Sequence, residues 1–329
     1  MIKVRRAIIA SLAVLVGLLL TACAVSQGQA SNPAGNPAST TAPVEVAAEP
    51  TTAPTETEAP TLAPTLTETP APTDTPVPTD TPTATPTATP AAPMPLIAID
   101  PGHGGVDLGA RHFNAAGKMT IHESNAALAI SLRLREVLEE RGYRVLLTRD
   151  GDYSLMDAKT EADYDTITEL QMRLDKVNEA QADLFLSIHM NGYDGGSHAT
   201  TQEVWGTMTL YCEDRPFSDN NRRFAELVQN GILEALTEFG HDAKDRGVQL
   251  DNSMPDPGQP PRHLIVLGPQ SDRIVRPSEM PGILSEPVFI SSDAEEAILT
   301  DPEGIDALAQ AYADAIDTYF AELADSSAE

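Results

Sequence analysis

A low-complexity stretch of about 70 residues limits what this 329-residue chain can fold into. Residues 24–93 are almost entirely Pro, Thr, Ala and acidic residues, and the part from Asn32 to Pro93 contains no Lys or Arg. Units such as Thr73-Asp74-Thr75-Pro76 recur along it. Such a composition cannot bury a hydrophobic core, and its prolines favour an extended polyproline II path. The sequence therefore predicts a disordered linker over 23–93 and a single globular domain over 94–325.

The N-terminus has the form of an export signal. Basic residues among the first six precede an apolar run over 7–20, which is shorter than the roughly 20 residues that a bilayer span needs. The following Leu20-Thr21-Ala22-Cys23 resembles the lipobox of bacterial lipoproteins. That resemblance implies a signal peptide over 1–22, a lipidated Cys23 and anchoring of the exported chain to the bacterial cell membrane. The linker is then a tether or a passive spacer, and an ordinary secretory signal is the alternative for 1–22.

Charge and cysteine content exclude some functions. The formal net charge is -28, and a surface this acidic repels nucleic acid, so we expect no nucleic-acid partner. The chain has two cysteines, and lipidation of Cys23 leaves Cys212 without a disulfide partner. Cys212 ends an apolar run over 208–212, which favours a buried strand thiol over a reactive one. The oligomeric state is not predicted by any of these features.

Short apolar runs alternate with amphipathic segments through the globular part. The pattern predicts strands at 96–99, 144–148, 184–189, 207–212, 264–267 and 282–285, and helices at 123–141, 168–180, 220–239 and 302–323. Strands that alternate with helices are typical of a sheet with mostly parallel neighbours. The predicted fold class is therefore α/β, a single domain whose mostly parallel mixed sheet is flanked by helices.

Three predicted strands end in a histidine or a carboxylate. His103 follows the first strand in Pro101-Gly102-His103-Gly104, His189 ends the third, and Glu286 follows the last. Open α/β sheets bind ligands beyond the carboxyl ends of their strands, so we expect these side chains to converge. Glu123, at the start of the first helix, completes a set of two imidazoles and two carboxylates. Catalytic zinc often takes two histidines and a glutamate as ligands, which leaves one carboxylate to act as a base.

The same residues carry a family resemblance. Asp100-Pro101-Gly102-His103-Gly104-Gly105, then Glu123, then Ser187-Ile188-His189-Met190-Asn191 and then Glu286 resemble the four ordered blocks of the zinc-dependent N-acetylmuramoyl-L-alanine amidases, or amidase type 3. The resemblance covers residues 95–320. It implies that His103, Glu123 and His189 bind Zn²⁺ and that Glu286 is the catalytic carboxylate. The implied reaction is hydrolysis of the amide bond between N-acetylmuramic acid and L-alanine in peptidoglycan, by a zinc-activated water outside the cell membrane.

Other functions and other residues remain open at this stage. A non-catalytic, wall-binding surface lipoprotein and a zinc peptidase of the same fold are the alternatives. His122 is not expected to be a ligand, and the remaining histidines, at 112, 198, 241 and 263, are expected to be solvated. Arg149 is either a contact near the cleft or a partner in an ion pair, and Trp205 either stacks on sugar or packs in the protein. The segments 192–206 and 249–281 depart from the family pattern, and we expect both to line the substrate groove.

Overall fold

The computed structural model describes residues 94–253 and 260–326. The predicted signal peptide, Cys23 and the linker to residue 93 lie outside the described residues, so these predictions are not tested by the fold. Among the residues that are described, no helix is both long enough and apolar enough to span a membrane.

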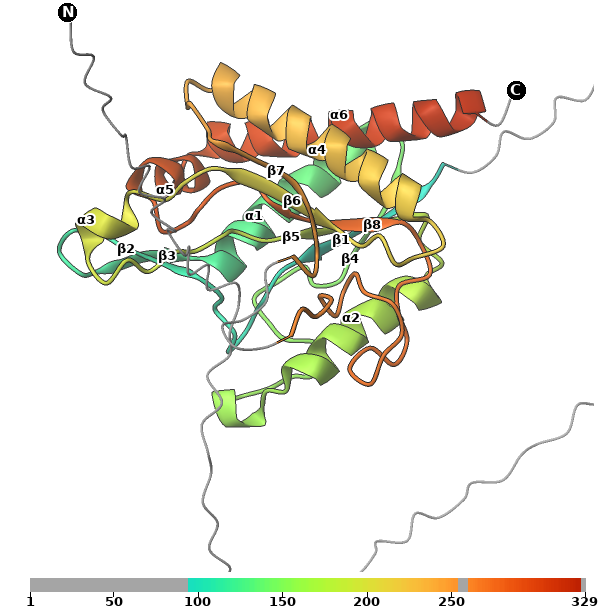
Figure 1. The fold of residues 1–329 in the computed structure, drawn as a ribbon, viewed down its shortest axis with the longest axis horizontal. Helices are drawn as coiled ribbons and strands as arrows, with labels where there is room; N and C mark the ends of the chain where they lie inside the picture. The colour runs from blue at the N-terminus through green and yellow to red at the C-terminus, as the bar shows by residue number, and fades with distance from the viewer. Residues whose placement is uncertain (1–93, 254–259, 327–329) are drawn as a thin grey trace, which may run out of the picture. The chain divides into compact units, whose positions relative to one another are not determined.

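A six-stranded sheet forms the centre of the domain (Figure 1). Its strands are β1 (Leu96–Pro101), β4 (Arg144–Leu147), β5 (Leu184–Ile188), β6 (Thr207–Tyr211), β7 (Asp245–Leu250) and β8 (Gly282–Glu286), in the order β4-β1-β5-β8-β6-β7. The first four strands in this order are parallel. Direction reverses between β8 and β6, and β7 is parallel to β6. The carboxyl ends of β4, β1, β5 and β8 therefore lie along one edge of the sheet, and those of β6 and β7 lie along the opposite edge, at the other end of the strands.

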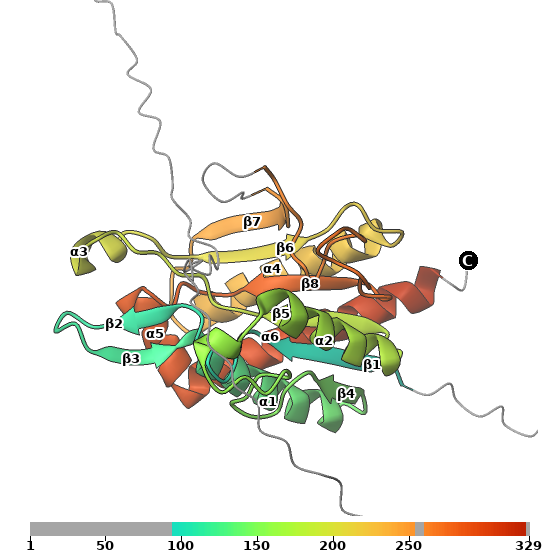
Figure 2. The ribbon, with the colours of Figure 1, turned by 90° about the horizontal axis from the view of Figure 1, so that it is seen from below.

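Helices cover both faces of the sheet, as the two views in Figures 1 and 2 show. Helices α1 (Glu123–Glu140), α4 (Ser218–Glu238) and α6 (Pro302–Ser326) lie on one face, and α2 (Thr166–Glu179) lies on the other. Side chains alternate along β1, so that Ile97 and Ile99 pack toward the three helices while Leu96 and Ala98 pack toward α2. Burial of both faces explains why the central strands are continuous apolar runs. The α/β fold class predicted from the sequence is confirmed.

Several small elements were not expected from the sequence. The strands β2 (Arg111–Phe113) and β3 (Met119–His122) form an antiparallel hairpin. The short helices are η1 (Glu161–Asp163), α3 (His198–Thr201) and α5 (Asp293–Thr300). The hairpin, α3 and α5 lie at the same end of the domain (Figure 2), and Asp293 of α5 accepts hydrogen bonds from His112 and His198.

The strand predicted at 264–267 is wrong. These residues form turns, with Leu267 N and Gly268 N both donating to the carbonyl oxygen of Leu264. Their apolar side chains are nevertheless buried, because the segment packs with α2 on the second face of the sheet. A four-residue apolar run predicts that the side chains are buried, but it does not by itself predict the backbone conformation.

Candidate functional site

His103 lies in the tight loop that follows β1. Its φ is 60°, in the left-handed region that non-glycine residues rarely adopt, at a cost of about 1–2 kcal/mol. Surrounding contacts hold this conformation. Gly104 N donates to the carbonyl oxygen of Asp107 at 2.8 Å, and Gly102 N donates to Ile188 O at 2.9 Å. The loop is therefore fixed against the end of β5, which carries the second histidine.

Glu123 is the first residue of α1 and is fully buried. Its Oε2 accepts from Ala110 N at 2.8 Å, and its Oε1 accepts from Met190 N at 3.0 Å. Burial alone would raise the pKa of Glu123, but the charge and hydrogen bond of His103, with those of His189, hold it well below its usual range. The position in the first turn of a helix also favours the carboxylate form. Glu123 is thus kept ionised in the interior.

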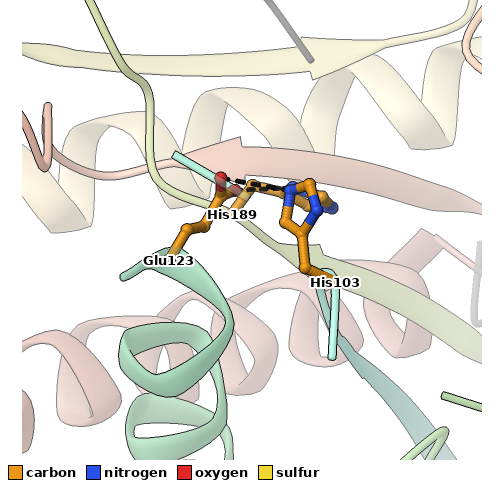
Figure 3. Close-up of side chains that lie close together, drawn as sticks. All are labelled: His103, Glu123 and His189. Atoms are coloured by element: carbon orange, nitrogen blue, oxygen red, sulfur yellow. Dashed lines mark hydrogen bonds and ion pairs between the residues drawn. The ribbon is translucent and has the colours of Figure 1, made fainter. Parts of the chain in front are cut away.

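His189 follows β5 and meets the other two side chains (Figure 3). Its Nδ1 is 2.8 Å from Glu123 Oε1, and His103 Nε2 is 3.1 Å from Glu123 Oε2. The two imidazole rings are 4.9 Å apart between centroids and nearly perpendicular. One nitrogen of each ring and one carboxylate oxygen all lie within 4.8 Å of one another, so the group can hold a metal ion. The predicted convergence of these three residues is confirmed.

Asp107 supports His103 and was missed by the sequence reasoning. Its Oδ2 accepts from His103 Nδ1 at 2.9 Å and from the hydroxyl of Tyr164 at 3.0 Å. Burial alone would raise the pKa of Asp107, but its hydrogen bond and charge interaction with His103 outweigh this and lower the pKa. Metal-binding histidines usually donate their second ring N–H to a carboxylate. Asp107 therefore fixes the His103 ring with its Nε2 directed at Glu123.

Two buried arginines hold the loop by its carbonyl oxygens. Arg149 donates to Pro101 O at 3.0 Å, to Gly102 O at 2.8 Å and to Ser124 O at 2.7 Å. Arg173 donates to Pro101 O at 2.7 Å and to His103 O at 2.5 Å. Burial, followed by the charge of Arg173, lowers the pKa of Arg149 to about 10. Of the two roles considered for Arg149, the structure favours the contact near the cleft, because its guanidinium bonds to backbone carbonyls of the His103 loop.

Two glycines are required by the close packing of the three side chains. A Cβ at Gly102 would lie 2.4 Å from the His189 ring. Gly109 has φ +66°, and a Cβ there would lie 2.5 Å from Glu123 Oε2 and 2.6 Å from the His103 ring. Neither contact is possible for a larger residue without displacement of the site. The sequence signal for Gly109, an isolated glycine in a polar loop, was too weak to single it out.

Glu286 ends β8, beside the backbone of His189. The register pairs Ile188 with Ser285, and His189 N donates to Ser285 O at 2.9 Å, so the next residue of each strand lies at the same edge of the sheet. Glu286 is half-buried there. The group of described residues that can hold a metal ion consists of His103, Glu123 and His189, and the catalytic role of Glu286 stays a prediction.

The other histidines differ from expectation in part. His122 is outside the group, as expected, with its Nδ1 2.9 Å from the Ser124 hydroxyl. His112 is only 2% exposed, and it bonds Thr120 and Asp293, so the prediction that it is solvated is wrong. Its burial comes from the β2–β3 hairpin, which the sequence did not predict.

The two segments that depart from the family pattern begin and end at opposite edges of the sheet. Residues 192–206 connect the carboxyl end of β5 to the start of β6, and the register pairs Met208 with Glu286, so both ends of this segment are at the edge that carries His189. Trp205, 38% exposed, belongs to it and is not a core residue. Residues 251–281 leave the carboxyl end of β7 and return to the start of β8, at the other edge. Both ends of this second segment therefore lie away from His189, and its expected place along the groove stays a prediction.

The fold and the three side chains together define a class of protein. Two imidazoles and a buried carboxylate at the carboxyl edge of an open α/β sheet are the donor set of hydrolases that bind zinc by His₂Glu and keep one position for water. The model of the N-acetylmuramoyl-L-alanine amidase family, Amidase_3, matches residues 97–318. The chain belongs to this family, as the sequence motifs indicated.

Individual relatives agree with the family match. A germination-specific N-acetylmuramoyl-L-alanine amidase of Bacillus subtilis is 27% identical over 232 residues, 70% of this chain and 81% of the relative. A cell wall amidase of Bacillus anthracis, itself uncharacterized, is 29% identical over 225 residues, which are 68% of this chain but only 35% of that longer protein. The solved CwlD amidase of Clostridioides difficile, in complex with the GerS lipoprotein, has a TM-score of 0.50 and 26% identity, and the match covers 69% of this chain and 98% of that one.

Proposed function

We propose that this chain hydrolyses the amide bond between N-acetylmuramic acid and L-alanine in peptidoglycan. The proposal is carried by the convergence of His103, Glu123 and His189 within a domain that belongs to the amidase family. The relatives named as N-acetylmuramoyl-L-alanine amidases support the same bond. The acidic charge of the chain gives no bulk attraction to an anionic wall, so recognition must come from local contacts at the site edge.

We propose Zn²⁺ as the cofactor, held by His103, Glu123 and His189. The donor set suits zinc, which takes imidazole nitrogen and carboxylate oxygen at about 2.0–2.2 Å. Tetrahedral ligands at those bond lengths lie about 3.3–3.5 Å apart. In the structure His189 Nδ1 lies 2.8 Å from Glu123 Oε1 and His103 Nε2 lies 3.1 Å from Glu123 Oε2, and one ligand atom from each side chain lies within 4.8 Å of the other two. When bound, zinc supplies Lewis acidity that polarises a carbonyl oxygen and lowers the pKa of a water toward about 7.

The chain's own residues have distinct roles in this proposal. Glu123 supplies the negative charge, because its backbone donors at Ala110 and Met190 keep it ionised and oriented. Asp107 holds the proton of His103 Nδ1 and thereby fixes the ring. Glu286 takes a proton from the attacking water and delivers it to the leaving nitrogen of L-alanine, a contribution of about 10² to 10⁴ in rate. Its support is its place beside His189 and its absence from the ligand group.

The test uses the full chain on purified cell-wall sacculi, with added zinc and with a chelator. An amidase releases alanine amino groups without new reducing sugar, whereas a peptidase releases other amino termini. A wall-binding protein without catalysis sediments with the sacculi and releases nothing. We expect alanine amino groups that disappear when the chelator is added. Release of other amino termini, or none, would replace the amidase proposal with one of its two alternatives.

Glu286→Gln separates the proposed proton transfer from metal binding. We expect the variant to keep its metal and its fold while turnover falls about 10² to 10⁴-fold, because the amide cannot accept the proton. Glu140→Gln, at the exposed last residue of α1, the end of that helix opposite Glu123, is the matched control and should keep wild-type turnover. Undiminished turnover in Glu286→Gln would remove this residue from the mechanism and leave the ligand assignment intact.

We also propose that residues 1–22 are a lipoprotein signal peptide and that residues 23–93 tether the catalytic domain, residues 94–325, to the membrane through lipidated Cys23. A Pro-rich segment of this length extends on the order of 100–200 Å, far enough to place the domain within a wall. The support is the motif Leu20-Thr21-Ala22-Cys23 and the linker composition. Cys23→Ser should move the chain from the membrane fraction to the soluble fraction of expressing cells, and continued membrane sedimentation would contradict lipid anchoring.

A further inference from the structure

A second group of ligand-type side chains lies far from the first. Cys212, Asp251 and His263 each offer one atom, and the three atoms lie within 4.8 Å of one another. Cys212 directly follows β6 and Asp251 directly follows β7, whose last residues, Tyr211 and Leu250, are register partners. Asp251 N donates to Tyr211 O at 2.9 Å. The two parallel strands therefore deliver a thiol and a carboxylate side by side at their carboxyl ends.

Strand direction places this group at the opposite edge of the sheet from His103, Glu123 and His189. The strand β6 is antiparallel to β8, so that the carboxyl end of β6 lies beside the start of β8 and not beside Glu286. Figure 1 shows β6 and β7 as neighbours at one side of the sheet. The reversal that ends the parallel part of the sheet thus creates a second edge with the geometry that binds ligands in open α/β sheets.

The spacing within the group is close to that of tetrahedral metal ligands. Cys212 Sγ lies 3.5 Å from His263 Nδ1, and Asp251 Oδ2 lies 3.2 Å from the same nitrogen. Zinc bonds of about 2.3 Å to sulfur and about 2.0–2.1 Å to nitrogen and oxygen place tetrahedral sulfur and nitrogen about 3.5 Å apart, and nitrogen and oxygen about 3.3 Å apart. The nearer carboxylate oxygen, Asp251 Oδ1, hydrogen-bonds with the same nitrogen at 2.9 Å, and a bound cation would replace that hydrogen bond.

His263 also has the partner that metal-binding histidines usually have. Its Nε2 lies 3.2 Å from Asp214 Oδ2, on the side of the ring away from Cys212. A carboxylate that accepts the Nε2 proton fixes the tautomer and leaves Nδ1 free to bind a cation. The contact is longer than the 2.9 Å hydrogen bond between Asp107 and His103 at the first site, and the Asp214 side chain is 59% exposed.

We propose that Cys212, Asp251 and His263 bind a thiophilic divalent cation of the zinc class, with Asp214 orienting the histidine and solvent completing the coordination. This site is structural. It joins the ends of β6 and the edge strand β7 to the turn segment at 263–268, which covers the second face of the sheet. Cys212 is 0% exposed, which favours a structural role for its thiol over a catalytic one. The proposal does not depend on the amidase activity.

Cobalt titration of the full chain distinguishes the two sites, because only a thiolate ligand gives a near-ultraviolet sulfur-to-cobalt charge-transfer absorption. We expect this band in the wild-type chain. It should persist in His189→Ala, which damages the first site, and in Cys23→Ser, which removes the other cysteine. It should vanish in Cys212→Ser. Absence of the band from folded wild-type chain at saturating cobalt would overturn the proposal and leave a metal-free Cys-His-Asp hydrogen-bonded group.

A second pair of variants keeps the test decisive if Cys212→Ser does not fold. His263→Gln should abolish the band, whereas His241→Gln, at a partly buried histidine paired with Glu295, should keep it. Asp214→Asn should lower the cobalt affinity, measured from the growth of the charge-transfer band, about 10- to 100-fold, because loss of an orienting carboxylate typically has an effect of this size. A charge-transfer band in His263→Gln that appears with the same cobalt affinity as in the wild type would refute the proposed site. None of these readouts uses amidase activity, so failure of this proposal and failure of the amidase proposal are separate results.

Discussion

Replacement of Arg173 by methionine tests whether a buried ion network holds the loop that carries His103. The Arg173 side chain is 1% exposed, and its partners Asp100 and Glu169 are equally buried. It also donates to the carbonyl oxygens of Pro101 and His103. Methionine fills a similar volume but leaves two buried carboxylates and two carbonyl oxygens without this donor. The remaining positive charge, Arg149, interacts with both carboxylates, but its hydrogen bonds go to backbone carbonyl oxygens such as Pro101 O and Gly102 O.

The expected loss is large on the scale of domain stability. Removal of one partner from a buried ion pair costs about 3–5 kcal/mol, against a total of about 5–15 kcal/mol for a typical domain. Urea unfolding of Arg173→Met should show this loss. Arg276→Met is the matched control. Arg276 forms an ion pair with Asp175, which like Arg173 is on α2, but this pair lies on the surface. The urea midpoint of Arg276→Met should therefore differ little from that of the wild type.

The destabilisation should also depend on pH with a definite sign. Burial alone would raise the pKa of Asp100, but Arg173, with hydrogen bonds from Thr148 and Ser187, lowers it. In the wild type the lowered pKa of Asp100 contributes stability at pH values above its unfolded pKa of about 3.9. This contribution is lost as the pH falls through the lower pKa of the folded state. Without Arg173, burial raises the folded pKa, so the variant loses stability as pH rises. The gap between wild type and variant should therefore shrink below about pH 4, and a constant or widening gap would refute the reasoning.

Two further substitutions test the surroundings of the candidate metal group. Asp107→Asn should lower zinc affinity about 10- to 100-fold in a competition titration, because the amide holds the His103 ring less firmly than the carboxylate does. Unchanged affinity would remove Asp107 from the site. Gly109→Ala should reduce zinc affinity more than Gly117→Ala. Both glycines have a positive φ, +66° and +73°, but only a Cβ at residue 109 would contact Glu123 and His103. Equal losses of affinity would show that backbone strain alone is responsible.

The sequence predicted the core of the fold because the central strands are buried on both faces. Each of β1, β5 and β8 is a continuous apolar run, and such runs are recognisable without knowledge of their partners. The missed strands lack this signal. The hairpin strand β3 is largely exposed, and β7, Asp245–Leu250, is a mostly polar edge strand with β6 as its one neighbour. Their pairing depends on turns and register, which periodicity does not encode.

The candidate site was predictable to a different depth for different residues. His103, His189 and Glu286 end strands, and strand ends of a parallel sheet meet at one edge, so their approach follows from topology. Asp107 and Gly109 act through contacts within one loop, whose path no pattern specifies. His263 was expected to be solvated, but its ring contacts Asp251, because the segment that carries it folds back on the end of β7. Cys212 is buried, as predicted.

The reversal of direction between β8 and β6 also determines which loops can contact a substrate. Segment 192–206 begins after His189 and ends at the strand that pairs with Glu286, so it is confined to the edge of the candidate active site. Segment 251–281 has both ends at the other edge, near Cys212 and Asp251. Preference for a stem peptide or a glycan should therefore change with substitutions around Trp205, which is exposed in the first segment. Substitutions at the second edge should change metal content and stability instead, because β6 and β8 are antiparallel and their carboxyl ends lie at opposite edges of the sheet.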